Sequence, residues 1–378
     1  GEANATRDRL RRAGLDKDWP TQDPDARPDE TFGEPLGRGE GVERALDLDR
    51  PTTAYAVMGS AIRGRRGESL DANRKRLGAL WERFARVAAT NPVAWDRSAP
   101  DADAIITPGP DNRMVAFPYT KALCANNRVD MASALVVCSL ERARSLGVRT
   151  DAGVFPLVAL AATDTPRLVD RADLSRVPAL EALVAETWRV SGLGLDDIDV
   201  FELYACFPSL VELSTEALGL ADDDPRPPTV TGGLGFAGAP LNNSAGQGLA
   251  ALTRAVREAG GIGLLHANGG SAANKHALGL YGVRPPAGGF RVATVSVDAP
   301  RISVVEESTP DVEVDGTVEA YTVVHDRERP ARTLGALRVD PATRTWFASD
   351  DAELARQAES ADLLGARLHR RADGSVAP

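Results

Sequence analysis

The sequence predicts an α/β fold followed by a β-rich segment, and three observations support this. Between residues 151 and 285, apolar strand-like runs alternate with amphipathic helical runs. A glycine-rich stretch, TVTGGLGFAGAPLNNSAGQG, spans residues 229–248 and leads directly into a helical pattern. After about residue 289, apolar and polar residues alternate in short runs, as they do in strands. Alternating strands and helices are typical of a mostly parallel sheet with helices on both faces.

Composition narrows the class of protein. The chain has 378 residues, of which 43% are hydrophobic and 26% charged, as in a soluble globular protein with two or three domains. Its net charge of −10 argues against nucleic acid as a partner, because nucleic-acid binding needs a basic surface. No apolar run reaches the length of a membrane span, so no membrane partner is expected.

The cysteines and histidines give no sign of a disulfide framework or a metal site. The three cysteines lie far apart, at Cys124, Cys138 and Cys206. This spacing favours a reducing, cytoplasmic location. Cys138 lies in the apolar run ALVVC, so we expect it in the core. The histidines show no HExxH spacing, and no metal ligands are therefore predicted.

The first 130 residues are expected to form helices separated by irregular segments. Residues 1–15 are typical of the end of a helix, whereas residues 20–41 are rich in proline, glycine and acid and predict a surface loop. Apolar residues recur every three or four positions in 68–89, which predicts an amphipathic helix with aromatic core residues. Residues 98–130 lack periodicity, and so long an irregular segment in a compact protein is often functional.

Later in the chain the periodicity is clearer. Strands are expected at residues 132–139, 154–162, 197–207 and 261–267. Helices are expected at residues 140–148, 178–193, 209–220 and 246–259. Ligands of such sheets bind at the carboxyl ends of the strands, so residues 204–207, 229–248 and 266–270 form the candidate site. The β-rich tail suggests a small β-barrel like an OB-fold, and without a basic stripe it is interpreted as a packing or partner-docking module.

The glycine-rich stretch has two interpretations. Asn243 and Ser244 occupy a plausible helix N-cap, where converging backbone N–H groups would attract a phosphate, a carboxylate or a developing oxyanion. The alternative is a tight connection between a strand and a helix that binds no ligand.

Four segments together resemble the carboxyl-terminal half of the thiolase superfamily, especially the sterol-carrier-protein type and the thiolase-like proteins called type 1. The segments are FPYTKALCANNRVD, DIDVFELYACFPS, TVTGGLGFAGAPLNN and HANGGSAANKHALGLY. The resemblance implies a thiolase fold with a loop domain at 1–128, a carboxyl-terminal α/β half at 129–287 and an additional OB-like domain at 288–378. It also implies that the amino-terminal half, which carries the acylated cysteine, lies outside this chain. That half or a second protomer is then an expected partner.

The resemblance also implies a site that lacks two of the catalytic residues of thiolases. Where thiolases have Gly-His-Pro, this chain has Gly238-Ala239-Pro240, and Ala267 stands where they have the cysteine of Cys-x-Gly. Tyr204, Cys206 and His276 remain as candidate catalytic residues. The candidate binding residues are Gly238, Ala239, Asn242, Asn243, Asn268 and Gly269. For Tyr204 a place at the edge of the core is an equal alternative, and for His276 a structural hydrogen bond is preferred; His266 is expected to be a satisfied buried imidazole.

By resemblance, the predicted function is that of an acyl-CoA-binding protein among acetyl-CoA acetyltransferase-like acyltransferases of lipid or fatty-acid metabolism. Ordinary thiolysis is not expected, and whether the chain is an enzyme is left open. Coenzyme A or acyl-CoA is the expected ligand, with no tightly bound cofactor. The alternatives are a non-catalytic acyl-CoA or lipid carrier, and a retro-aldolase acting on acyl-CoA thioesters with Tyr204 as its proton-transfer residue.

Overall fold

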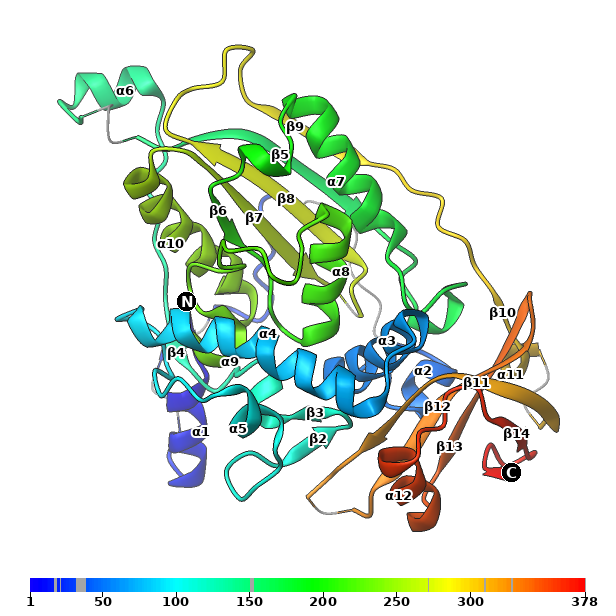
Figure 1. Cartoon of the computed structure of the whole chain (residues 1–378). Coiled ribbons are helices and arrows are strands. Elements are labelled where there is room, and N and C mark those ends of the chain that lie inside the picture. Colours follow the sequence, from blue (N-terminus) through cyan, green and yellow to red (C-terminus); the bar gives the residue numbers. More distant parts are fainter. Residues whose placement is uncertain are drawn as a thin grey trace.

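The structure is a computed structural model of the whole chain, drawn in Figure 1. The residues it describes are 1–16, 19–20, 22–31, 39–149, 153–270, 272–308, 311–327 and 329–377. Parts of the predicted loop at 20–41 lie outside these ranges.

A mixed five-stranded sheet lies at the centre of the α/β part, in the order β6-β7-β8-β5-β9. Its strands are β5 (Phe155–Thr163), β6 (Val200–Glu202), β7 (Ile262–Gly269), β8 (Lys275–Gly282) and β9 (Arg291–Val295). β6 runs parallel to β7 and β9 parallel to β5, but β8 is antiparallel to both of its neighbours. The expectation of a mostly parallel sheet was therefore wrong, because β7 and β8 form a hairpin that the sequence interpretation missed.

Helices cover both faces of this sheet (Figure 1). α7 (Pro178–Ser191) and α8 (Pro208–Leu218) lie on one face, and α10 (Ser244–Ala259) lies on the other. A Cβ atom at Gly263 would lie 2.5 Å from Val256, so α10 approaches the sheet closely there. All three helices were predicted within a few residues.

Two long helices, α3 (Pro51–Arg66) and α4 (Leu70–Thr90), lie below α8 in Figure 1, and both contact it. Ser69 caps α4 by accepting a hydrogen bond from the Ala72 N–H, and the predicted helix at 68–89 is confirmed. The sequence interpretation did not single out α3. The shorter elements of this region are β1 (Glu2–Ala3), α1 (Asn4–Arg12), α2 (Val42–Ala45), α5 (Ala102–Ile106), β2 (Met114–Ala116), β3 (Tyr119–Thr120), β4 (Asp130–Met131), α6 (Leu140–Ser145) and α9 (Gly233–Phe236).

The C-terminal residues form a second sheet, in the order β10-β13-β12-β11-β14-β15, to which β2 adds beside β11. Its elements are β10 (Ser303–Val304), α11 (Val305–Ser308), β11 (Val314–Val324), β12 (Arg332–Asp340), β13 (Thr343–Ser349), α12 (Ala352–Ser360), β14 (Arg367–Arg370) and β15 (Val376–Ala377). We call residues 303–377 the C-terminal sheet. It curls back on itself, since Ala348 N donates to Gly374 O at 3.1 Å, which is compatible with the predicted small barrel. The domain limits at 128 and 287 remain predictions.

The strand expected at 132–139 does not form. No strand among the described residues pairs with this segment, and Val136 and Val137 are 97% and 88% exposed. Cys138 is exposed as well, so its expected place in the core was wrong. An apolar run predicts burial only where another element covers it, and no described element does so here.

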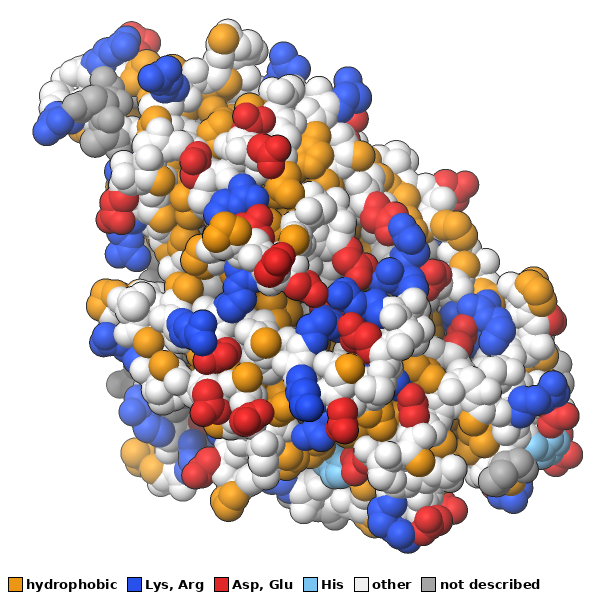
Figure 2. Space-filling view, in the orientation of Figure 1, with side chains coloured by type: hydrophobic (Ala, Val, Ile, Leu, Met, Phe, Trp, Pro, Cys, Tyr) orange, Lys and Arg blue, Asp and Glu red, His pale blue; other side chains and the backbone are white. Residues whose placement is uncertain are grey.

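Surface charges are mixed on the face shown in Figure 2, where Lys and Arg side chains lie beside Asp and Glu. Arg66, for example, bonds both Glu216 and Asp222 and so ties α3 to α8. The helices built from described residues are all too short or too polar to cross a membrane. Nor do three or more His, Cys, Asp or Glu side chains within the described ranges gather where they could hold a metal ion.

Candidate functional site

β6 ends at Glu202, and Tyr204 and Cys206 follow it at the carboxyl ends of β6 and its parallel neighbour β7, just before α8. Tyr204 is half-buried and shares a hydrogen bond with Ser244 at the start of α10. Cys206 is buried, and its carbonyl accepts a hydrogen bond from Ala125 N at 3.0 Å. The irregular segment at 98–130 therefore reaches the candidate site, and its functional role remains a prediction.

Tyr55 is the site residue that the sequence interpretation missed. It comes from α3, is 3% exposed, and stacks on Phe207 with ring centroids 4.9 Å apart. Its hydroxyl oxygen accepts hydrogen bonds from Asn268 Nδ2 at 2.9 Å and Ala273 N at 3.0 Å. With both acceptor directions used, the hydroxyl proton is free to point to the Cys206 thiol, with which Tyr55 also shares a hydrogen bond.

Burial keeps these groups protonated. It raises the pKa of Cys206 to about 12, although the hydrogen bond with Tyr55 opposes the rise. It also raises the pKa of Tyr204 to about 12, helped by the nearby Cys206. Desolvation raises the pKa of Tyr55 further still. A nucleophilic cysteine needs a populated thiolate, so Cys206 is a neutral thiol near pH 7 and the site is uncharged.

The glycine-rich stretch is held by bonds within the protein. The buried Glu202 carboxylate accepts from Val230 N at 2.8 Å and Thr231 N at 3.0 Å. Ala239 N donates to Asn126 O at 2.9 Å. Burial raises the pKa of Glu202, while its hydrogen bonds to this stretch oppose the rise. These backbone N–H groups therefore have partners already and are not free for an anion.

The two asparagines of the glycine-rich stretch differ in their surroundings. Asn242 is exposed. Asn243 stands at the N-cap of α10 without capping it, because its Oδ1 accepts instead from Ser133 Oγ at 2.8 Å. Its Nδ2 is buried and has no partner among the described residues. The buried Gly238 and Ala239 lie beside them, whereas Gly269 is exposed at the end of β7.

His276 lies directly opposite Asn268 in the β7–β8 hairpin but takes part in a separate chain of hydrogen bonds. Its Nε2 lies 3.0 Å from Ala273 O, its Nδ1 lies 3.1 Å from His266 Nε2, and His266 Nδ1 lies 3.2 Å from Ser214 Oγ. The carbonyl can only accept, so His276 Nε2 carries the proton and Nδ1 accepts from His266. Burial lowers the pKa of His276 to about 4 and also lowers that of His266.

The backbone N–H and carbonyl of Ala273 connect the hydrogen bonds of Tyr55 to the chain of hydrogen bonds through His276 and His266. Ala273 is fully buried and has φ of 48°, in the left-handed region that L-residues rarely adopt. Such a conformation costs about 1 kcal/mol or more and persists only where the surroundings hold it. Here the N–H is bonded to Tyr55, and the carbonyl is bonded to both His276 and Arg171.

A cleft of about 870 Å³ opens beside the site. Cys124, Ala125 and Asn126 form part of its wall, as do Gly235 and Phe236 of the glycine-rich stretch. Five Lys or Arg side chains line it against three Asp: Arg50, Arg113, Lys121, Arg128 and Arg327 against Asp96, Asp111 and Asp326. This excess of positive charge favours an anionic ligand in a chain whose net charge is −10.

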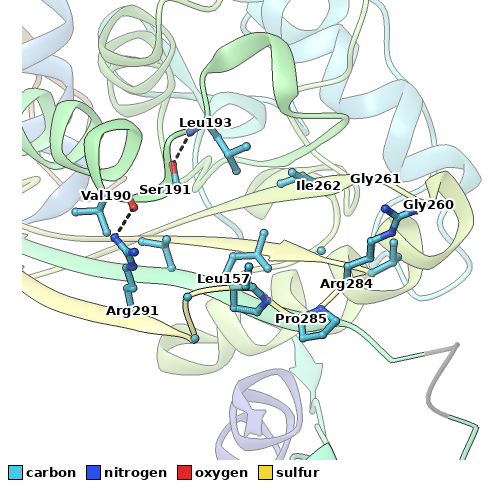
Figure 3. Close-up of a pocket in the computed structure, with 17 residues that line it drawn as sticks. Leu157, Val190, Ser191, Leu193, Gly260, Gly261, Ile262, Arg284, Pro285 and Arg291 are labelled. Atoms are coloured by element: carbon cyan, nitrogen blue, oxygen red, sulfur yellow. Dashed lines mark hydrogen bonds between the residues drawn. The ribbon is translucent and has the colours of Figure 1, made fainter.

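A second pocket, of about 490 Å³, lies at the opposite end of the five-stranded sheet (Figure 3). The first residues of β5 and β7, including Leu157 and Ile262, form its floor. Arg284 and Arg291 flank it, and Arg291 Nη1 donates to Val190 O at 3.0 Å near the end of α7. Because the candidate residues lie at the other ends of these strands, this pocket is separate from the candidate site.

Comparisons with known proteins agree with this architecture, although no family model matches the chain. It is 28% identical over 198 residues to an acetyl-CoA acetyltransferase of Methanothermobacter thermautotrophicus, covering 48% of this chain and 50% of that protein. It is 29% identical over 137 residues to the benzoylsuccinyl-CoA thiolase subunit BbsB of Thauera aromatica, covering 36% and 33%. The matches thus span half or less of the length of these curated relatives.

Among solved structures, the chain resembles a monomeric SCP2-thiolase-like protein type 1 from Mycobacterium smegmatis. The TM-score is 0.75 and the identity 30%, over 86% of this chain and 72% of that one. The fold is therefore a thiolase-type α/β fold, as predicted. The chain belongs to the thiolase superfamily, among the SCP2-thiolase-like proteins of type 1.

Proposed function

We propose that this chain binds acyl-CoA thioesters at the Tyr204–Cys206 strand end, with the coenzyme A phosphates in the basic cleft, and that it does not carry out ordinary thiolysis. The observation that carries this proposal is a set of neutral hydrogen-bonding groups beside a cleft with excess positive charge. Phosphates suit guanidinium and ammonium donors, and a thioester carbonyl suits neutral donors such as Asn268. A role in lipid metabolism is part of the same proposal.

The absence of thiolysis follows from which proton carriers remain. The family resemblance assigns the histidine and the cysteine of thiolases to Ala239 and Ala267, and alanine cannot transfer a proton. Cys206 holds its proton because of burial. Both ring nitrogens of His276 are occupied by His266 and Ala273, so this imidazole is not free to act as a base.

Titration calorimetry with acetyl-CoA tests the binding. We expect micromolar affinity in the full chain and a loss of at least tenfold for Arg327→Glu in the cleft. Arg284→Glu is the matched control, because it reverses an exposed arginine in the pocket of Figure 3. Equal losses in the two variants, or no binding at all, would reject the site.

The expected lack of thiolysis is tested by an assay for CoA-dependent cleavage of a 3-ketoacyl-CoA, in which we expect no turnover above background.

A retro-aldol activity is the second candidate function. It is favoured by the position of Tyr204 just past the end of β6, beside Cys206, where a phenol can transfer a proton. Tyr204→Phe should then abolish aldol cleavage and leave acetyl-CoA binding intact, and unchanged cleavage would exclude Tyr204.

A further inference from the structure

The C-terminal sheet is attached to both partners of the contact between Tyr55 and Ala273. We propose that this sheet positions the two residues for the candidate site, through α3 on one side and through Arg344 and Arg171 on the other. The proposal concerns the geometry of the site and does not depend on which ligand the site takes.

The first attachment holds the helix that carries Tyr55. Arg63 lies two turns further along α3 and donates two hydrogen bonds to Asp362, at 2.6 and 2.7 Å. Its side chain is only 4% exposed. Ser60 Oγ on the same helix accepts from the Tyr321 N–H of β11 at 2.8 Å. Bidentate and buried bonds of this kind restrict sliding or rotation of α3 against the sheet.

The second attachment holds residues 168–172, which precede α7. Arg344 on β13 is fully buried and donates from Nη1 to Arg171 O at 2.5 Å and to Val169 O at 3.2 Å. Its guanidinium is itself paired with Glu319 of β11. Three more bonds join the same segment to the C-terminal region: Ile302 N to Asp170 O at 2.9 Å, Ala172 N to Pro300 O at 3.2 Å and Arg338 Nη2 to Ala172 O at 2.8 Å.

Arg171 connects the segment 168–172 to the candidate site through its side chain. Its side chain is buried, and Nη2 donates to Ala272 O at 2.5 Å and to Ala273 O at 3.0 Å. Its Nε and Nη1 have no partner among the described residues, so the guanidinium is committed chiefly to this turn. The left-handed Ala273 needs such support, and its N–H is the group that reaches the Tyr55 hydroxyl.

The two attachments therefore meet at one hydrogen bond of 3.0 Å between Ala273 N and the Tyr55 hydroxyl. A displacement of about 0.5 Å on either side takes this bond beyond ordinary hydrogen-bond length. Arg344 is accordingly a positioning residue that acts through Arg171, and it does not itself touch a ligand.

Hydrogen exchange in the full chain, without ligand, tests this. In Arg344→Lys the amides of residues 272–274 should exchange at least tenfold faster than in the parent, while those of α8 keep their rates. Arg370→Lys is the matched control. Arg370 is also a buried arginine of the C-terminal sheet, but its bonds run to Trp346 O and Val312 O. It should leave residues 272–274 unchanged.

The proposal is overturned if Arg344→Lys leaves the exchange of 272–274 as it is, or if Arg370→Lys accelerates it equally. Should Arg344→Lys fail to fold, Arg171→Lys removes the same link at its other end, and unchanged exchange in that variant is equally decisive. Acetyl-CoA titration of the parent chain is a separate measurement. A parent that fails to bind would reject the proposed function and leave the exchange result standing.

Discussion

The glycine-rich stretch and the strand-end site, which is formed by Tyr55, Tyr204, Cys206 and Asn268, both belong to the region that resembles thiolases. They differ in whether their polar groups already have partners within the protein. In the glycine-rich stretch, Glu202 and Asn126 take backbone N–H groups into bonds within the protein. At the strand end, Tyr55 and Asn268 contribute side-chain atoms, and Asn268 Oδ1 has no partner among the described residues. A glycine-rich loop at a helix start therefore binds an anion only where its N–H groups remain free.

The glycines of the glycine-rich stretch allow close packing against neighbouring elements. Gly232 has φ of 101°, and a Cβ there would lie 2.4 Å from Ala88 Cβ. Such an approach is open to glycine alone. The stretch is thus a closely packed frame between α4 and the sheet. The following predictions test this difference between frame and site.

Glu202→Ala should have the largest effect, because it removes the acceptor that holds the frame. It leaves Val230 N without a partner and removes one acceptor each from Thr231 N and from the hydroxyls of Thr229 and Thr231, which keep hydrogen bonds among themselves. Unsatisfied buried donors cost about 1–3 kcal/mol each before relaxation, so we expect the free energy of unfolding to fall by about 4 kcal/mol. Urea denaturation measures it, and a fall below about 1 kcal/mol would show that the carboxylate is not what holds the stretch.

The sequence predicted much of the fold because strong periodicity marks elements that are buried on one side. α4, α7 and α10 were found in this way. α3 was not found, because residues 53–63 are buried all round and show no polar face. The available signals were Pro51 at its first position and Gly67 just after its end.

The site was less accessible to sequence reasoning. Tyr204, Cys206 and Asn268 were named from their places at strand ends, and their roles remain predictions. Tyr55 has no motif around it and lies about 150 residues from Cys206, so only the folded chain brings the two together. The hydrogen bonds from Val230 N and Thr231 N to Glu202 could not be predicted either, because no local sequence pattern shows which acceptor a backbone N–H bonds.

The next largest effect is a loss of unfolding free energy at low pH, which we expect from His276 near the strand-end site. The pKa of His276 is about 4 in the folded chain, below its ordinary value of 6.5, because of burial. The unfolded chain thus binds more protons between these values, so stability is full above pH 6.5 and is lost as the pH falls to 4. We expect a loss of about 3 kcal/mol, to which His266 adds.

Urea denaturation at pH 7 and pH 4.5 measures this loss. His276→Gln should reduce the difference in stability between the two pH values, and His369→Gln, which changes a half-exposed side chain of β14, should retain it. An equally steep dependence in His276→Gln would place the titrating group elsewhere.

Tyr55→Phe should cost about 2 kcal/mol of unfolding free energy, because Asn268 Nδ2 and Ala273 N lose their acceptor while the ring stays in place. The affinity for acetyl-CoA should change as well, since Asn268 is then free to turn. Tyr281→Phe is a matched control on β8, and it should cost less than 1 kcal/mol. Equal costs in the two variants would deny Tyr55 a special place in the site.

The smallest effect on stability belongs to Asn242→Ala, and it decides whether the frame also touches a ligand. Asn242 is exposed, so unfolding should change by less than about 0.5 kcal/mol. Because Glu202 and Asn126 already occupy several of the loop N–H groups, a ligand contact from this stretch is best made by a side chain such as Asn242. We expect acetyl-CoA affinity in calorimetry to fall about fivefold, equivalent to about 1 kcal/mol. Unchanged affinity would assign binding to the strand end and leave the glycine-rich stretch with a structural role.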